Sequence, residues 1–127
     1  MGVSDRLDAF RESLSGCDLV VLADLSTETV LSSSADIAPS QEELDALTAE
    51  ACATIVGPVG EGAAILLQGE PERPRLAVVA GAQATRVFVA PEGRGAEALL
   101  ISLRPGSALD RIFDCAGDVL ADILADS

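Results

Sequence analysis

The segment Leu19-Val20-Val21-Leu22-Ala23 is continuously apolar, and it decides how this chain folds. A strand with one solvent-facing side alternates apolar and polar residues, whereas an uninterrupted apolar run indicates a strand that is buried on both faces. Such a strand needs one covering layer above the sheet and another below it. We therefore expect an α/β protein of the α+β type, with helices on both faces of a single sheet.

The segments on either side of this strand predict a helix before it and a return strand after it. Ser4 is a suitable N-cap for a helix that runs to about Leu14 with apolar residues at helical spacing. Residues 24–29 predict a turn. Val30-Leu31 then starts a short return strand that ends in the serines at 32–34. Together these segments predict a hairpin.

A middle helix has the clearest local signal in the chain. Ser40 is followed three residues later by Glu43, which fits the capping box, and apolar residues then recur at helical spacing as far as Ile55. Gly57-Pro58 interrupts this helix. The next apolar run, residues 62–68, fits either a strand or a buried helix. Its alanines and leucines favour a second helical piece.

The last third of the chain predicts a meander and a closing helix. Residues 75–80, 85–90 and 97–103 are extended segments separated by turn residues. Ser107 is a candidate N-cap for the closing helix, whose apolar stripe runs from residue 109 to residue 124. The expected order is α-β-β-α-β-β-β-α, a single domain over residues 1–127 with a five-stranded antiparallel sheet between helical layers.

The composition limits the kinds of partner this chain can bind. Its 127 residues include 21 acids, eight arginines and no lysine, for a net charge of −13. Such a chain repels nucleic acid and anionic membrane surfaces. No apolar run has the length of a membrane span, and the N-terminal residues do not resemble a signal peptide. We therefore expect a cytoplasmic protein that binds other proteins, with no nucleic acid partner and no membrane insertion.

The residues needed for common catalytic sites are missing. Without histidine the chain lacks the usual general base near neutral pH and the commonest metal ligand, and Cys–His or Ser–His pairs are impossible. Residues 57–62 are rich in glycine, but they follow a helix, whereas a phosphate-binding loop follows a strand. Cys17, Cys52 and Cys115 match neither a zinc pattern nor a disulfide framework. We expect a non-enzymatic protein without metal or cofactor.

The cysteines and the aspartates of the last helix each allow a structural and a functional interpretation. Cys52 and Cys115 fit small core residues, whereas Cys17 begins a strand and is expected to be more accessible. Aspartates recur every fourth residue, and because four residues overshoot one helical turn they form a winding acidic ridge instead of a metal cage. The ridge is either a solvent-facing surface or a docking site for a basic partner. Its members are Asp110, Asp114, Asp118 and Asp122, followed by Asp126.

The predicted elements resemble the Roadblock/LC7 family, in its bacterial-type single-domain form, over nearly the whole chain. The matching segments are residues 19–23, residues 29–34, the alanine-rich middle helix and the closing run from residue 75 to residue 103. Two features differ from the family pattern. Residues 24–28 lack the glycine of its usual first turn, and Gly57-Pro58 breaks the middle helix.

This resemblance implies a profilin-like fold and a homodimer paired through the middle helix and the strand that follows it. It also implies a non-catalytic scaffold or regulator of a Ras-like small GTPase or an associated signalling complex. Pairing would protect an apolar edge strand from aggregation. A different interpretation is a small-ligand sensor with an apolar pocket between its helices and its sheet. The implied dimer or partner interface comprises Leu44, Leu47, Thr48, Ala51, Ile55, Leu76, Val78 and Val79.

Overall fold

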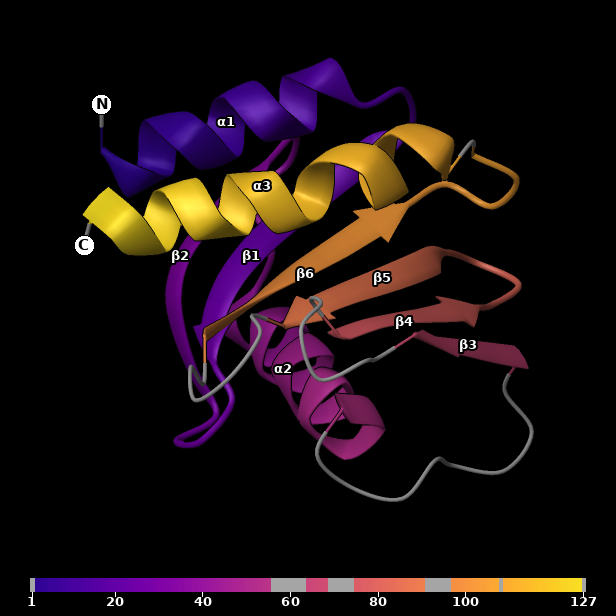
Figure 1. Cartoon of the computed structure of the whole chain (residues 1–127). Helices are drawn as coiled ribbons and strands as arrows, with labels where there is room; N and C mark the ends of the chain where they lie inside the picture. Colours follow the sequence, from indigo (N-terminus) through magenta and orange to yellow (C-terminus); the bar gives the residue numbers. More distant parts are fainter. Residues whose placement is uncertain (1, 56–63, 69–74, 91–96, 108, 127) are drawn as a thin grey trace.

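The computed structural model describes residues 2–55, 64–68, 75–90, 97–107 and 109–126. These residues form three helices and one antiparallel sheet of six strands in the order β2-β1-β6-β5-β4-β3. Helices α1 and α3 lie side by side over one face of the sheet, and α2 covers the other face (Figure 1). The elements are α1 (Val3–Ser13), β1 (Cys17–Asp24), β2 (Thr29–Ala35), α2 (Gln41–Ile55), β3 (Ala64–Gln68), β4 (Arg75–Ala80), β5 (Thr85–Ala90), β6 (Glu97–Leu103) and α3 (Asp110–Asp126).

Strand β1 is buried on both faces, as its uninterrupted apolar run predicts. Val20 and Leu22 pack beneath α1 and α3, whereas Val21 and Ala23 pack beneath α2. The strand lies between β2 and β6. Two separate apolar layers therefore hold this sheet together, one on each face, because burial of aliphatic side chains is the main stabilising contribution.

The five expected strands are present, and a sixth strand joins them. The expectation of a helical piece within residues 62–68 is wrong, because Ala64–Gln68 forms β3. The register of β3 on β4 runs from Ala64 opposite Ala80 to Gln68 opposite Leu76. Backbone hydrogen bonds to a neighbouring strand outweigh the modest helix preference of alanine and leucine in this segment.

Strand β2 is longer than the sequence predicts. The expected end of the return strand in serines 32–34 is wrong, since Ser32, Ser33 and Ser34 pair with Leu22, Val21 and Val20 of β1. Ladder hydrogen bonds join backbone groups, so polar side chains at a sheet edge do not prevent pairing. The register shifts between Leu22 and Ala23. This bulge bends the edge strand.

The turn between β1 and β2 is held by Asp24 in the absence of a glycine. One carboxylate oxygen of Asp24 accepts hydrogen bonds from the backbone N–H of Ser26 at 2.8 Å, the Ser26 hydroxyl at 2.6 Å and the backbone N–H of Thr27 at 3.3 Å. The Ser26 hydroxyl is the largest cause that lowers the pKa of Asp24. Glu28 completes the turn in the left-handed region with φ +52°, where a glycine is the usual residue.

The helix starts confirm one of the three predicted caps. The Ser40 hydroxyl accepts a hydrogen bond from the backbone N–H of Glu43 at 3.1 Å, and α2 begins at the next residue, Gln41. The other two predicted caps are wrong. Helix α1 begins at Val3, which places Ser4 inside it, and the Ser107 hydroxyl donates to the backbone oxygen of Arg104 at 2.7 Å instead of capping α3.

Candidate functional site

The predicted interface residues of α2 lie on its inner face. Leu47 is 8% exposed, and Thr48 and Ala51 are 0% exposed. Leu44 is half-buried against the same cluster, and its backbone oxygen accepts a hydrogen bond from the Thr48 hydroxyl at 2.8 Å. These side chains pack on the sheet of their own chain, so a second chain reaches α2 only at its outer face. The side chain of Ile55 lies outside the described residues.

The predicted interface residues of β4 are also packed inside the chain. Val78 and the half-buried Leu76 belong to the layer beneath α1 and α3, and Val79 belongs to the layer beneath α2. The expectation that this strand forms the edge of the sheet is wrong, because β4 lies between β3 and β5. Among the described strands, β3 is the terminal strand on this side and is also the strand that follows the middle helix.

The outer face of α2 carries small side chains. Ala46, Ala49 and Ala53 are exposed and recur at helical spacing, on the side opposite Leu47 and Ala51. Within the described part of the chain, α2 is the one helix on its face of the sheet (Figure 1). Small side chains let a second helix approach closely, since interaxial distance depends on the residues at the contact.

An ion pair attaches α2 to the sheet. The guanidinium Nε of Arg86 in β5 lies 2.5 Å from a carboxylate oxygen of Glu50, and both side chains are about one-third exposed. Together with the buried Leu47 and Ala51, this contact holds α2 against the sheet. A partner helix would meet a surface with a fixed orientation.

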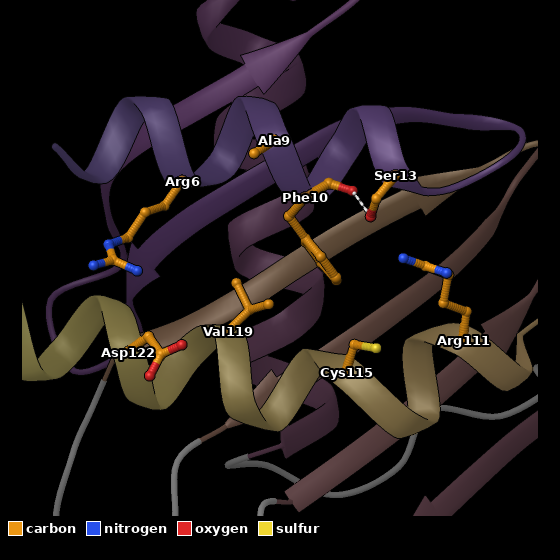
Figure 2. Close-up of a pocket in the computed structure, with 8 residues that line it drawn as sticks. All are labelled: Arg6, Ala9, Phe10, Ser13, Arg111, Cys115, Val119 and Asp122. Atoms are coloured by element: carbon orange, nitrogen blue, oxygen red, sulfur yellow. Dashed lines mark hydrogen bonds between the residues drawn. The ribbon is translucent and has the colours of Figure 1, made fainter. Parts of the chain in front are cut away.

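A groove between α1 and α3 is the second candidate site, and its position between these two helices is not predicted by any local sequence pattern. Figure 2 shows residues of the two helices facing each other across this space. The groove has a volume of about 320 Å³. We call it the α1–α3 groove. It is lined by Arg6, Ala9, Phe10 and Ser13 of α1 and by Arg111, Cys115, Val119 and Asp122 of α3.

Each wall of the α1–α3 groove follows a helical spacing that is visible in the sequence. Arg6, Phe10 and Ser13 recur at intervals of four and three residues, and Arg111, Cys115 and Val119 at intervals of four. Such spacing places each set on one side of its helix. The two sides face each other because of how both helices pack on the sheet. A local sequence pattern does not predict that packing.

The acidic ridge of α3 is exposed at all four predicted positions, Asp110, Asp114, Asp118 and Asp122. The side chain of Asp126 lies outside the described residues. Among the residues that the structure describes, no group of three or more histidines, cysteines or carboxylates could hold a metal ion. The ridge therefore presents separate carboxylates to solvent.

The cysteines differ from expectation at two positions, Cys17 and Cys52; Cys52 was expected in the core, but it is half-buried and belongs to neither apolar cluster. Cys17 is 5% exposed, so the expected accessibility is wrong. Burial raises the pKa of its thiol to about 11, and burial followed by the Glu28 carboxylate raises the pKa of Cys52. A thiol that stays protonated near neutral pH is a poor nucleophile. Cys115 is half-buried and lines the α1–α3 groove.

No protein-family model matches this sequence, and no curated protein matches it either. Within the described ranges, no helix is long and apolar enough to cross a membrane. The glycine-rich stretch at residues 57–62 lies outside the described residues.

Proposed function

We propose that this chain is a non-catalytic interaction module that pairs with a second copy of itself. The contact would combine the outer face of α2 with β3, the terminal strand of the sheet among the described strands. The observation that carries this proposal is the exposed stripe of Ala46, Ala49 and Ala53 on α2, the one helix on its face of the sheet within the described ranges. A terminal strand favours pairing with another strand, and β3 is terminal among the described strands, which supports the same arrangement.

The resemblance to the Roadblock/LC7 family supports this proposal. That family pairs through the middle helix and the strand that follows it, which are α2 and β3 in this chain. The dimer then acts in the cytoplasm as a scaffold or regulator of a Ras-like small GTPase or an associated signalling complex. The exposed carboxylates of Asp110, Asp114 and Asp118 offer a surface of suitable charge for an arginine- or lysine-rich region of that partner.

The experiment that tests pairing is light scattering across a dilution series, with two matched variants. Ala49→Glu adds bulk and like charge to the outer face of α2, and Ala121→Glu makes the same change on an exposed site of α3. Both keep good helix formers, so both should fold. We expect the unmodified chain and Ala121→Glu to remain dimers at low micromolar concentration, and Ala49→Glu to become a monomer. A monomeric unmodified chain, or a dimeric Ala49→Glu, would contradict the proposal.

A Leu47→Arg variant would not distinguish a damaged dimer interface from an unfolded chain. Leu47 is buried against the sheet, so an arginine there would disrupt the core of the single chain. Loss of the dimer in that variant would follow from unfolding as readily as from a damaged interface. The exposed Ala49 avoids this ambiguity, because its side chain makes no core contact.

The GTPase proposal needs a test of its own. We expect the dimer to bind a Ras-like GTPase from the same organism, and binding to weaken when Asp114 and Asp118 are both replaced by Asn. If the dimer stimulates hydrolysis, it should do so by repositioning residues of the GTPase. Single arginine-to-alanine variants should then leave the hydrolysis rate unchanged. A large loss of rate in one of them would identify a catalytic arginine and overturn this mechanism.

A further inference from the structure

We propose that the α1–α3 groove binds an amphiphilic monocarboxylate of the fatty-acid class. The apolar chain would lie along Ala9, Phe10 and Val119, and the carboxylate would meet Arg111. This site is on the opposite face of the sheet from α2 and goes beyond the pairing function proposed above. It is also independent of pairing, because none of its lining residues comes from α2 or β3.

The size and lining of the groove suit a small apolar ligand. Its volume of about 320 Å³ lies at the lower end of ligand pockets, which span roughly 300–1,000 Å³. Phe10 is buried on the α1 wall, and Val119 and Cys115 are half-buried on the facing wall. Water in contact with these side chains is released when an apolar chain replaces it, which favours binding.

The shape of the groove favours a linear ligand. On α3 the lining residues extend from Arg111 to Asp122, a length of about 16 Å at roughly 1.5 Å per residue. A volume of about 320 Å³ spread over that length suits an extended alkyl chain.

Arg111 supplies the charge that selects an anionic head group. The other arginines with described side chains are engaged: Arg11 with Asp36, Arg86 with Glu50, Arg104 with Asp18, and Arg6 as well. Among the arginines whose side chains the structure describes, Arg111 is the one without a hydrogen bond or an ion pair. It is exposed, and in Figure 2 its guanidinium points across the groove toward α1.

The charges at the two ends of the groove determine the direction of the ligand. Arg111 lies in the first turn of α3, where the positive end of the helix dipole adds to the attraction for an anion. Asp122 and Arg6 both line the other end, so the positive charge there is offset by a carboxylate. The carboxylate of the ligand therefore belongs at Arg111 and the end of its alkyl chain near Asp122.

The test is calorimetric titration of the intact chain at low salt with three probes. Decanoate, kept below its micelle concentration, carries both required parts, acetate lacks the alkyl chain, and decyltrimethylammonium reverses the charge. We expect one decanoate per chain, no detectable acetate binding, and binding of the cation at least about tenfold weaker. Equal binding of decanoate and decyltrimethylammonium, or no binding of decanoate, would overturn the proposal.

Two pairs of variants locate the site. Arg111→Gln should weaken decanoate binding by about tenfold, and Arg104→Gln, also at an exposed arginine but outside the groove, should leave it unchanged. Ala9→Leu fills the groove and should also weaken binding, whereas Ala121→Leu should not. Circular dichroism confirms that all four fold. The inference is wrong if each groove variant binds decanoate as tightly as its control.

The two proposals can fail separately. Decanoate binding to the monomeric Ala49→Glu variant would support the groove site even where pairing is lost. Conversely, a stable dimer that does not bind decanoate would support the pairing proposal and exclude the ligand site.

Discussion

The guanidinium Nε of Arg11 donates a hydrogen bond to the Ser34 hydroxyl at 2.8 Å, which joins α1 to the edge strand β2. Ser34 is only 4% exposed, and its hydroxyl donates in turn to the Asp8 carboxylate. Arg11 also pairs with Asp36 just beyond β2. Each polar group in this small network has a partner, as burial requires.

Replacement of Ser34 by alanine should therefore destabilise the chain. The change removes the hydroxyl that Arg11 and Asp8 share, and the expected loss is about 1–3 kcal/mol of unfolding free energy. Urea denaturation measures it. Ser33→Ala is the matched control, since the neighbouring serine makes no side-chain hydrogen bond in the described part of the chain. That control should change stability by less than about 0.5 kcal/mol, and equal losses would refute the role assigned to Ser34.

Two glycines in the same backbone conformation should differ in their tolerance of a side chain. Gly16 and Gly106 both have φ +80°. A Cβ at Gly106 meets no atom within 4 Å, whereas a Cβ at Gly16 would lie 2.5 Å from the Ser107 hydroxyl oxygen. Gly106→Ala should lower the unfolding free energy by about 1–2 kcal/mol, because alanine is disfavoured in the left-handed conformation. Gly16→Ala should lower the unfolding free energy by more than Gly106→Ala does.

The extra cost at Gly16 has a specific cause. Ser107 would have to move, and its hydrogen bond to the backbone oxygen of Arg104 would be lost. Denaturant unfolding of the two variants compares them directly. If Gly106→Ala were as damaging as Gly16→Ala, the close approach of Ser107 would not be the reason for glycine at position 16.

The buried thiol of Cys17 predicts a loss of stability at alkaline pH. Burial raises its pKa from 9.0 to about 11 in the folded chain. The folded state therefore holds a proton that the unfolded state releases, so the unfolding free energy should be constant below about pH 9 and decline as the pH rises toward 11. The raised pKa of Cys52 acts in the same direction.

Urea unfolding of the unmodified chain and of Cys17→Ala, each followed from neutral pH to pH 11, measures this effect. Cys17→Ala should lower the unfolding free energy at neutral pH, because packing is lost. Above pH 9, however, its unfolding free energy should decline less steeply than that of the unmodified chain. Parallel declines in the two proteins would mean that Cys17 does not cause the pH dependence.

The acidic ridge should weaken the helix that carries it. Asp118 lies one turn from Asp114 and from Asp122, so Asp118→Asn removes two like-charge pairs and should raise stability by about 0.4–1 kcal/mol at low salt. Asp110→Asn makes the same chemical change in the first turn of α3, where a carboxylate is favourable to the helix dipole. It should not stabilise the chain. A gain for Asp118→Asn that persists in high salt would rule out charge repulsion as its cause.

Short-range signals in the sequence predicted most of the fold. The Ser40–Glu43 cap placed the start of α2, and the apolar run at 19–23 placed the strand with a layer on each face. Both signals depend on residues close together in the chain. The site was harder to predict, because Leu47 and Ala51 were expected at a contact between chains and instead face their own sheet.

By itself the sequence determined the order of the helices, the five expected strands and the two apolar layers, because helical and strand periodicities are local properties of the chain. Only the tertiary structure decided that residues 64–68 form a strand, since their apolar run suits either conformation until β4 supplies hydrogen-bond partners. It also decided that Arg111 faces Phe10 across a groove. That proximity depends on how α1 and α3 pack together over the sheet, and residues about a hundred positions apart acquire it only in the folded chain.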